Sequence, residues 1–542
     1  MFNRCLSRLA GVAAIIIAAP TLSAQLRVVT WNISNYSGGR DADLKNAIYG
    51  VHEGRSMSPD VVLAQEFLSQ AAVNSFLNIL NTAPGSPGDW QAATFINGPD
   101  TDNAFFYRSS KVTFLGQTVT ALGSSSTANQ PRDTNRYDIR LVGYSSSAAS
   151  IGMYSTHMKA QGGTNDSGRR LIEAQRIRSN AQGVDTNGPG SALPIGFRFL
   201  VGGDFNIQTS NEAAYQAMVG SQSNNDGRLF DPINTPGSWN NSGAFALVHT
   251  QDPIGAGGMD DRHDQILISA TLTDGEGLSY IGNPSIPYRS LMVPPFGTPI
   301  DNTQWNDPNH SYRCWGNDGT SFDTTLVTVQ TTSNGAAVNR ENGMVGASIA
   351  TSLRNVASGG GHLPVLLDLR VPAKLGAPLQ VDLGTVEQFS QVTMPIHIGN
   401  DGDVDLWTVN GIDDLRYHTT FGGSITFPVN TFTDAPGGGF NVHILELDTS
   451  MPGPVFGTII VSCNDVDEPL RHIDVTGMVV PPGPNCPGDV NGDDQVNGAD
   501  LSVLLGAFGQ SVSPGTSGDV NGDGQVDGAD LSVLLGAFGT SC

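Results

Sequence analysis

Acidic, amide and histidine side chains stand at the ends of six short apolar segments in the first two thirds of the chain. These residues are Asn32, Glu66, His157, Asp204 with Asn206, Asp264 and His362. Carboxylate and amide oxygens suit a divalent cation, and histidine and carboxylate side chains move protons near neutral pH. A phosphodiester repels anionic nucleophiles, so its hydrolysis needs a cation that neutralises charge and a carboxylate that prepares a water. The residue types therefore predict metal-assisted phosphodiester hydrolysis.

In this order along the chain, the six segments resemble the endonuclease/exonuclease/phosphatase superfamily, which includes deoxyribonuclease-I-like nucleases, sphingomyelinases and inositol-phosphate phosphatases. The resemblance spans roughly residues 26–371. It implies an α/β fold, a four-layer α/β/β/α sandwich. It also implies a Mg²⁺ or Mn²⁺ ion held by Glu66 as the principal ligand, with Asn32 beside it.

The same resemblance implies roles for the nucleophile side of the site. Asp204 would orient and deprotonate the attacking water, and Asn206 would donate a hydrogen bond to a phosphoryl oxygen as charge builds there. His157 would lie near the leaving-group oxygen. The simpler alternatives are an Asx-turn at Asp204–Asn206 and a buried structural histidine at position 157.

The remaining roles concern the scissile phosphate. His362 would stabilise it, and Asp264 would fix the tautomer of His362 and raise its pKa. Arg136 would be a further phosphate contact. As alternatives, Asp264 could belong to a solvated acidic loop and Arg136 could lie on the surface.

One position departs from the family pattern. The family ends with Ser-Asp-His-x-Pro-Val, whose Asp joins the metal cluster, whereas this chain has Gly361 directly before His362. Loss of that carboxylate should weaken or relocate metal binding. If the site has decayed, Gly361→Asp should raise turnover; if it has been reorganised, the substitution should bring no gain.

A second pattern lies at the C-terminus, where the segment Gly488–Gly509 recurs almost unchanged at Gly518–Gly539. Each copy places oxygen-bearing side chains at spacings that wrap six to eight oxygens around a hard cation, with position 7 ligating through its carbonyl. The predicted Ca²⁺ ligands are Asp489, Asn491, Asp493, Gln495 and Asp500 in the first copy and Asp519, Asn521, Asp523, Gln525 and Asp530 in the second.

An apolar helix is expected after each loop, and position 12 is Asp rather than the Glu of an EF-hand. Such loop–helix duplicates resemble dockerin type I modules. The resemblance implies a small α module that binds Ca²⁺ and attaches the protein to a cohesin or a cell-surface anchor.

Element patterns divide the chain into domains. Residues 25–372 alternate short apolar strands with helical stretches at Ser69–Leu80 and Arg169–Asn180, typical of packed sheets covered by helices. Residues 373–378 are expected to form a linker. Residues 379–480 show short alternating runs separated by turns, which predict an all-β, immunoglobulin-like sandwich. The dockerin-like module is expected at 486–542.

The N-terminus predicts export. Arg4 and Arg8 precede the apolar run Leu9–Ala19, and Leu22–Ala24 offers a cleavage site, so residues 1–24 are expected to be a signal peptide. No later segment is long and apolar enough to span a bilayer. We therefore expect a secreted or cell-surface protein. A bridge between Cys486 and Cys542 would tie the ends of the last module together, and the other two cysteines could pair or stay free.

The formal charge of −24 is uneven. Residues 25–372 carry 22 Lys and Arg against 29 Asp and Glu, whereas residues 373–542 carry 3 against 22. No basic stripe is visible, which argues against tight, sequence-reading nucleic-acid binding but not against cleavage with few phosphate contacts.

The sequence thus predicts a secreted, metal-dependent phosphodiesterase, with DNA or RNA as the favoured substrate. A phosphatase or a sphingomyelinase-type hydrolase stays open, as does a catalytically weakened surface-display or binding protein. A carbohydrate-active enzyme is disfavoured, because aromatic residues make up only 7% of the chain and the carboxylates fit metal chemistry better.

Overall fold

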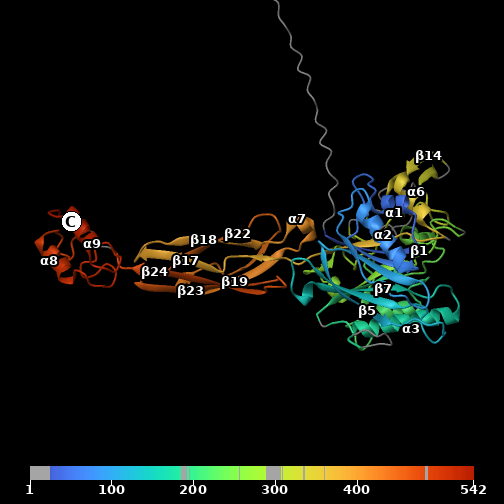
Figure 1. Ribbon diagram of the computed structural model, residues 1–542, viewed down its shortest axis with the longest axis horizontal. Helices are drawn as coiled ribbons and strands as arrows, with labels where there is room; N and C mark the ends of the chain where they lie inside the picture. The colour runs from blue at the N-terminus through green and yellow to red at the C-terminus, as the bar shows by residue number, and fades with distance from the viewer. Residues whose placement is uncertain are drawn as a thin grey trace, which may run out of the picture. The chain divides into compact units, whose positions relative to one another are not determined.

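The computed structural model describes residues 25–184, 192–194, 196–255, 257–288, 307, 309–333, 336–358, 360–482 and 486–541. The expected signal peptide and Cys542 lie outside these residues. The chain separates into two compact units, one formed by residues 1–371 with Leu406–Gly411 and the other by Pro372–Asp405 with residues 412–542 (Figure 1).

The first sheet of the N-terminal unit is built around two parallel central strands. Its strand order is β11-β15-β1-β2-β4-β3, and β12 pairs with β15. β1 lies parallel to β2 and antiparallel to β15, so the ends of β1 and β2 lie at the same edge. The strands are β1 (Leu26–Tyr36), β2 (Val61–Phe67), β3 (Trp90–Ala92), β4 (Asp102–Arg108), β11 (Ser279–Tyr280), β12 (Arg313–Cys314) and β15 (Val365–Arg370).

The second sheet has the order β5-β6-β7-β8-β10-β9. β7 and β8 are parallel, whereas β10 runs antiparallel to β8. The strands are β5 (Val112–Ala121), β6 (Thr134–Leu141), β7 (Ser150–His157), β8 (Arg198–Asp204), β9 (Leu229–Phe230) and β10 (Asp264–Ser269).

The two sheets pack against each other, because β1 and β2 contact β7 and β8, and β10 contacts β1 and β15. Helices lie on the outer sides: α1 and α2 accompany the first sheet, and α3 the second (Figure 1). The α-helices among the described residues of this unit are α1 (Asp41–Tyr49), α2 (Gln70–Thr82), α3 (Thr164–Ala181), α4 (Ala213–Val219) and α6 (Gly346–Val356), and a hairpin joins β13 (Val329–Ser333) to β14 (Ala336–Glu341). The predicted α/β class is confirmed, and the four-layer arrangement stays a prediction.

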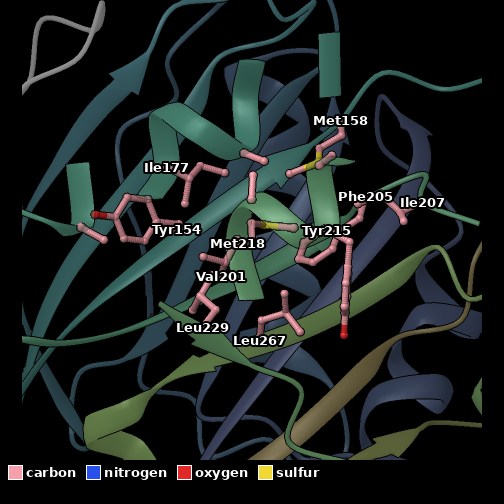
Figure 2. Packing of buried hydrophobic residues seen from close by; sticks show 14 of the residues in the cluster. Tyr154, Met158, Ile177, Val201, Phe205, Ile207, Tyr215, Met218, Leu229 and Leu267 are labelled. Atoms are coloured by element: carbon pink, nitrogen blue, oxygen red, sulfur yellow. The ribbon is translucent and has the colours of Figure 1, made fainter. Parts of the chain in front are cut away.

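Apolar side chains of the second sheet pack against α3 and α4. Tyr154 and Val201 on the strands meet Ile177 and Met218 on the helices, and all four are fully buried (Figure 2). α3 begins five residues before the predicted Arg169, since Asp166 accepts a hydrogen bond from the Gly163 amide and caps the helix start. This packing fixes the strand ends that carry the polar residues.

The second unit begins with two sheets around one core. The sheets have the orders β16-β18-β22-β20 and β17-β24-β23-β19-β21. Their strands are β16 (Leu375–Gly376), β17 (Gln380–Glu387), β18 (Thr393–Asn400), β19 (Leu415–Gly423), β20 (Ile425–Thr426), β21 (Thr431–Asp434), β22 (Asn441–Leu447), β23 (Gly453–Cys463) and β24 (Leu470–Val480). The immunoglobulin-like assignment stays a prediction.

The expected linker at residues 373–378 is wrong. Leu375 and Gly376 form β16 and pair with Asn400 and Gly399 of β18. Ala373 and Leu375 are buried in the core of the sandwich. Burial of the two apolar side chains and the pairing with β18 make the segment part of the sandwich.

The C-terminal segment contains two short helices, α8 (Gly498–Ala507) and α9 (Gly528–Gly536), each following a polar loop. Their core is small: it consists of Cys486, Val496, Leu504, Val526 and Leu534. Cys486 is disulfide-bonded, whereas Cys314 and Cys463 are free. Among the described residues, no helix combines the length and apolar character that crossing a bilayer requires.

Candidate functional site

The strand ends of both sheets of the N-terminal unit carry the predicted polar residues to one place. His157 lies beside Asp204 on parallel strands, and Asp264 lies opposite Asp204 on antiparallel strands. Residues paired in this way project from the same face of a sheet. Asn32 and Glu66 approach from the facing sheet, where β1 contacts β8.

Asn32 links the two sheets through its side-chain amide. Its Nδ2 donates to Glu66 Oε1 at 3.0 Å and to Asp204 Oδ2 at 3.1 Å. Glu66 Oε2 accepts from the backbone amide of Asn35 at 2.7 Å. Asn32 and Asp204 are almost fully buried, so their orientation is fixed by these contacts.

His362 lies between two carboxylates. Its Nδ1 is 2.8 Å from Asp264 Oδ2, and its Nε2 is 3.7 Å from Asp204 Oδ2. Thr250 Oγ1 also donates to Asp264 Oδ2 at 2.7 Å, which holds that carboxylate in place. Burial opposes the imidazolium, but the charges of Asp264 and Asp204 outweigh it and raise the pKa of His362 to about 10. His362 is therefore protonated at neutral pH.

His157 has the opposite character. Its Nε2 lies 3.3 Å from Asp204 Oδ2 and its Nδ1 3.8 Å from Glu66 Oε1. Burial, aided by the positive charge of Arg132, holds the pKa of His157 well below its usual value. Two imidazoles of opposite protonation state thus flank Asp204, which is a pattern of acid–base sites.

Asp204 is the centre of the cluster. Burial raises the pKa of its carboxyl, with Asp264 adding to the effect and His362 opposing it. Its Oδ1 accepts from the backbone amide of Asn206 at 3.1 Å, and Asn206 Nδ2 donates to the Met158 carbonyl at 3.2 Å. Asn206 therefore joins the cluster, next to the end of β7.

Two of these residues adopt strained backbone conformations. Glu66 has φ 64° and Asn206 has φ 52°. Asparagine tolerates the left-handed region, but glutamate does so rarely, and such strain costs about 1–3 kcal/mol and gathers at functional sites. The surrounding structure therefore holds the backbone of Glu66 and Asn206 in conformations that place their side chains in the cluster.

The structure does not bring Arg136 to the cluster. Arg136 pairs in register with Tyr154, and both point to the sheet face covered by α3. Its guanidinium donates to Asn180 Oδ1 at 2.7 Å and forms an ion pair with Asp138 at 2.8 Å. Side chains alternate between faces along a strand, and Arg136 lies on the wrong face to contact a phosphate at the cluster. Its role in the structure is to join β6 to α3.

Two residues of this region were not predicted. Thr250 contacts Asp264, as described above, and His263 is buried next to Asp261, with 3.7 Å between Nε2 and Oδ1. The position of His263 directly before Asp264 was the only sequence signal for it. For Thr250 the sequence carries none, because its contact depends on the loop before β10.

Gly361 has a backbone that excludes the expected carboxylate. Its φ is +73°, and a Cβ built there would lie 2.3 Å from the Cβ of Ala357. The segment instead pairs with the loop at residues 251–252: the Asp252 amide donates to the Gly361 carbonyl at 3.0 Å. This position is therefore shaped for glycine.

The donor set fits a divalent cation of the magnesium class. Glu66 offers carboxylate oxygens next to the Asn32 amide, and Mg²⁺ commonly binds through one or two carboxylates while keeping several waters. Asn32 Oδ1 accepts from the backbone amide of Ser34 at 3.0 Å, so the Asn32 amide would have to rotate before its oxygen joined Glu66 around an ion. Glu66 and Asn32 would hold the ion.

The two C-terminal loops repeat one hydrogen-bond pattern. Asp489 Oδ1 accepts from the Gly492 amide at 2.9 Å, as Asp519 Oδ1 does from Gly522. At position 12, one oxygen of Asp500 or Asp530 accepts two backbone amides of its own loop. In the first loop, oxygens of Asp489, Asp493 and Asp500 lie within 4.8 Å of one another, close enough to hold one cation.

Comparison with known families decides what this segment is. Residues 487–538 match the family model of the dockerin type I domain. The segment is a dockerin type I domain. A solved type II cohesin–dockerin domain from Bacteroides cellolosolvens is similar at 33% identity, covering 11% of this chain and 92% of that chain with a TM-score of 0.10.

The dockerin domain has two further features that follow from its repeat. Position 6 is Asp494 in the first loop and Gly524 in the second, and both adopt left-handed backbones with φ of 63° and 82°. Gln525 Nε2 donates to Ser511 Oγ, which agrees with a ligand role for the carbonyl of position 7 rather than its side chain.

Solved structures were also compared with the rest of the chain. An endonuclease/exonuclease/phosphatase from Beutenbergia cavernae is 11% identical, with a TM-score of 0.31, covering 83% of this chain and 100% of that one. Sphingomyelinase C from Streptomyces griseocarneus is 12% identical, with a TM-score of 0.31, covering 64% and 99%. A search of the curated proteins gave no match. At these scores the catalytic assignment depends on the geometry of the site.

Proposed function

We propose that the N-terminal unit is a divalent-metal-dependent hydrolase of phosphodiester bonds, with DNA or RNA as the favoured substrate. The observation that carries the proposal is the buried cluster around Asp204, where a protonated His362 and a neutral His157 lie on either side of one carboxylate. A phosphodiester needs this combination of a proton acceptor for water and a cationic donor for the phosphoryl oxygens.

The residues divide the chemistry as follows. Asp204 accepts the proton of the attacking water, because its raised pKa brings it closer to a base that works near neutral pH. The His362 imidazolium, held by Asp264, donates to a phosphoryl oxygen as negative charge grows. Asn206 uses its second amide hydrogen for another phosphoryl oxygen. A Mg²⁺ or Mn²⁺ ion, when bound at Glu66 and Asn32, neutralises phosphate charge.

His157 completes the proposal at the leaving group. Its Nδ1 is buried and has no hydrogen-bond partner among the described residues. An unpaired buried polar atom is costly, so a substrate oxygen that contacts it restores a lost interaction. This atom lies 3.8 Å from Glu66 Oε1, and the proposal places the leaving-group oxygen beside it.

We further propose that the enzyme is secreted and tethered. The dockerin domain supplies the tether, with Ca²⁺ as its ligand and a cohesin or cell-surface anchor as its partner. The N-terminal signal predicted from Arg4 to Ala24 supplies export.

The test uses the purified full chain with bis-p-nitrophenyl phosphate, a short DNA and a short RNA. Hydrolysis is expected with Mg²⁺ or Mn²⁺ and not with EDTA. Asp204→Asn should lower kcat by about 10²- to 10⁴-fold because it removes the general base. Asp226→Asn, the same change on an exposed loop, is the matched control and should keep full activity. Absence of hydrolysis of all three substrates under every metal would refute the proposal.

A second candidate is a display protein whose catalytic site has weakened. The observation in its favour is Gly361, which cannot carry the carboxylate expected there. This candidate predicts binding of a phosphodiester and of a cohesin without turnover. The same assay separates the two.

A further inference from the structure

A cavity of about 260 Å³ lies in the N-terminal unit, next to the end of β7. Its walls include the side chains of Arg132, Lys159 and Arg169, with Ser124 and the single carboxylate of Asp100. Three cations around one small cavity stand out in a chain whose net charge is −24. Arg132 helps to lower the pKa of His157, whereas Lys159 and Arg169 have no role in the proposed reaction.

The cavity adjoins the catalytic cluster through the segment that follows His157. Arg132 Nη1 donates to the carbonyls of His157 and Met158, at 3.4 and 3.3 Å. Met158 also accepts the Asn206 amide, so Arg132 and Asn206 share one carbonyl. Lys159 is the next residue and lines the cavity. A group in the cavity is therefore a near neighbour of the scissile position.

The cations of the cavity are only partly neutralised. Arg132 pairs with Asp100 at 3.1 Å, and Lys159 pairs with Asp166 at 3.2 Å. Arg169 is 8% exposed, and its hydrogen bonds go to the carbonyls of Asn129 and Ser124, at 2.6 and 2.5 Å. Among the described residues, no carboxylate forms an ion pair with Arg169. A buried guanidinium without a counter-charge is costly unless an anion completes its surroundings.

We propose that this cavity binds a second phosphate group of the substrate, one that flanks the scissile phosphodiester. The inference rests on the proposed function and names its substrate class: a molecule with two neighbouring phosphates, as in a nucleotide chain, rather than a diester with an uncharged or cationic headgroup. The Arg169 Nε and Nη2 atoms are used by the carbonyls of Asn129 and Ser124, which leaves Nη1 for a phosphate oxygen. Nη1 and the ammonium of Lys159 match phosphate oxygens in charge. The cavity would bind a single phosphate group, so this proposal does not require a basic stripe along the protein surface.

The experiment compares two chromogenic substrates on the full chain. One is the p-nitrophenyl ester of thymidine 5′-phosphate, and the other is the same ester with an added 3′-phosphate. The added phosphate is expected to raise kcat/KM by about tenfold, mainly through KM, which is the effect of one charge-assisted contact. Arg169→Gln and Lys159→Gln should each reduce this ratio toward one.

Two variants are used because Arg169 also holds the loop at residues 124–129, and its loss could unfold that loop. Lys159 is more exposed, so Lys159→Gln tests the charge alone. The matched control is Arg176→Gln, which removes one positive charge from the same helix. Arg176 contacts Asn129 Oδ1 and Gln130 Oε1 and does not line the cavity. The control should keep the wild-type ratio.

A binding measurement separates failure of this inference from failure of the proposed function. Thymidine 3′,5′-bisphosphate and inorganic phosphate are titrated calorimetrically into wild type, Arg169→Gln and Arg176→Gln. Tighter binding of the bisphosphate than of free phosphate, weakened only in Arg169→Gln, supports the site even if neither ester is hydrolysed. Equal turnover of both esters by the wild type, or equal binding of both phosphates, overturns it and leaves the phosphodiesterase proposal standing.

Discussion

The catalytic cluster and the dockerin loops are both built from carboxylates, but they use them in opposite ways. In the cluster, Asp204 and Asp264 are buried against histidines, and their charges set the pKa of His362. In the loops, Asp489 and Asp519 accept several backbone amides of their own loop, and the neighbouring side chains are largely exposed. In the cluster, the fold positions the carboxylates so that they can take part in a reaction. In the loops, the carboxylates stabilise the backbone of a short segment whose hydrophobic core is small.

The largest expected effect is a loss of kcat/KM when the catalytic cluster is disrupted. Asp264→Asn should lower kcat/KM by about 10²- to 10⁴-fold, because His362 loses the partner that fixes its tautomer and its charge. His362 is protonated below its pKa of about 10, so wild-type activity should fall as pH rises through about 10. In Asp264→Asn that falling limb should move to lower pH, which a pH profile of kcat/KM measures.

The control for this experiment is Asp261→Asn, which removes a nearby carboxylate that pairs with Asn240 instead of His362. Asp261→Asn should change neither kcat/KM nor the pH at which kcat/KM falls. The same pKa has a consequence for stability: a raised folded-state pKa stabilises the protein fully below the unfolded value near 6.5, and this contribution disappears as pH rises through about 10. An unshifted limb in Asp264→Asn would contradict the assigned role of His362.

The next largest expected effect is a loss of thermal stability of the dockerin domain when calcium is removed. Removal of calcium with EGTA should destabilise residues 486–541, because their core holds only five buried residues. A ligand at 1,000 times its dissociation constant contributes about 4 kcal/mol, which is large for such a small module. Calorimetry of the full chain should show the dockerin transition moving to lower temperature while the transition of the N-terminal unit stays in place.

Single variants sharpen that experiment. Asp489→Ala should reproduce part of the EGTA effect in the presence of calcium, since it removes a predicted ligand and the acceptor of several amides. Asp494→Gly is the matched control: it removes a charge from the same loop at a left-handed position where the second copy has Gly524. Equal shifts in both variants would mean that loop charge, not ligation, determines the stability.

The same contrast explains what the sequence could predict. All the predicted ligands of a dockerin loop lie within twelve residues, so local spacing predicted the Ca²⁺ loops, and the family model confirmed the resemblance to dockerin modules. The cluster draws on strands from Leu26 to Arg370, and its residues were found because six separated segments, taken in order, resemble a family pattern. Arg136 was misplaced because a one-residue change in strand parity puts a side chain on the other face. Thr250 and the basic cavity depend on loop paths that no local pattern encodes.

The smallest expected effect concerns Gly361, where sequence and structure lead to different expectations. If Gly361 stands in place of a lost metal ligand, Gly361→Asp should restore the carboxylate and raise turnover. In the structure, φ is +73° and a Cβ would lie 2.3 Å from that of Ala357, so Ala357, which directly follows α6, would have to shift. We expect Gly361→Asp to destabilise the N-terminal unit by about 1–3 kcal/mol and to bring no gain in turnover. Gly275→Asp separates the causes, because Gly275 has φ +77° and no neighbour within 4 Å of its Cβ position. A larger loss of unfolding free energy at 361 than at 275 measures the clash with Ala357. A rise in turnover in Gly361→Asp would instead mean that the catalytic cluster accommodates the new carboxylate, and it would contradict this prediction.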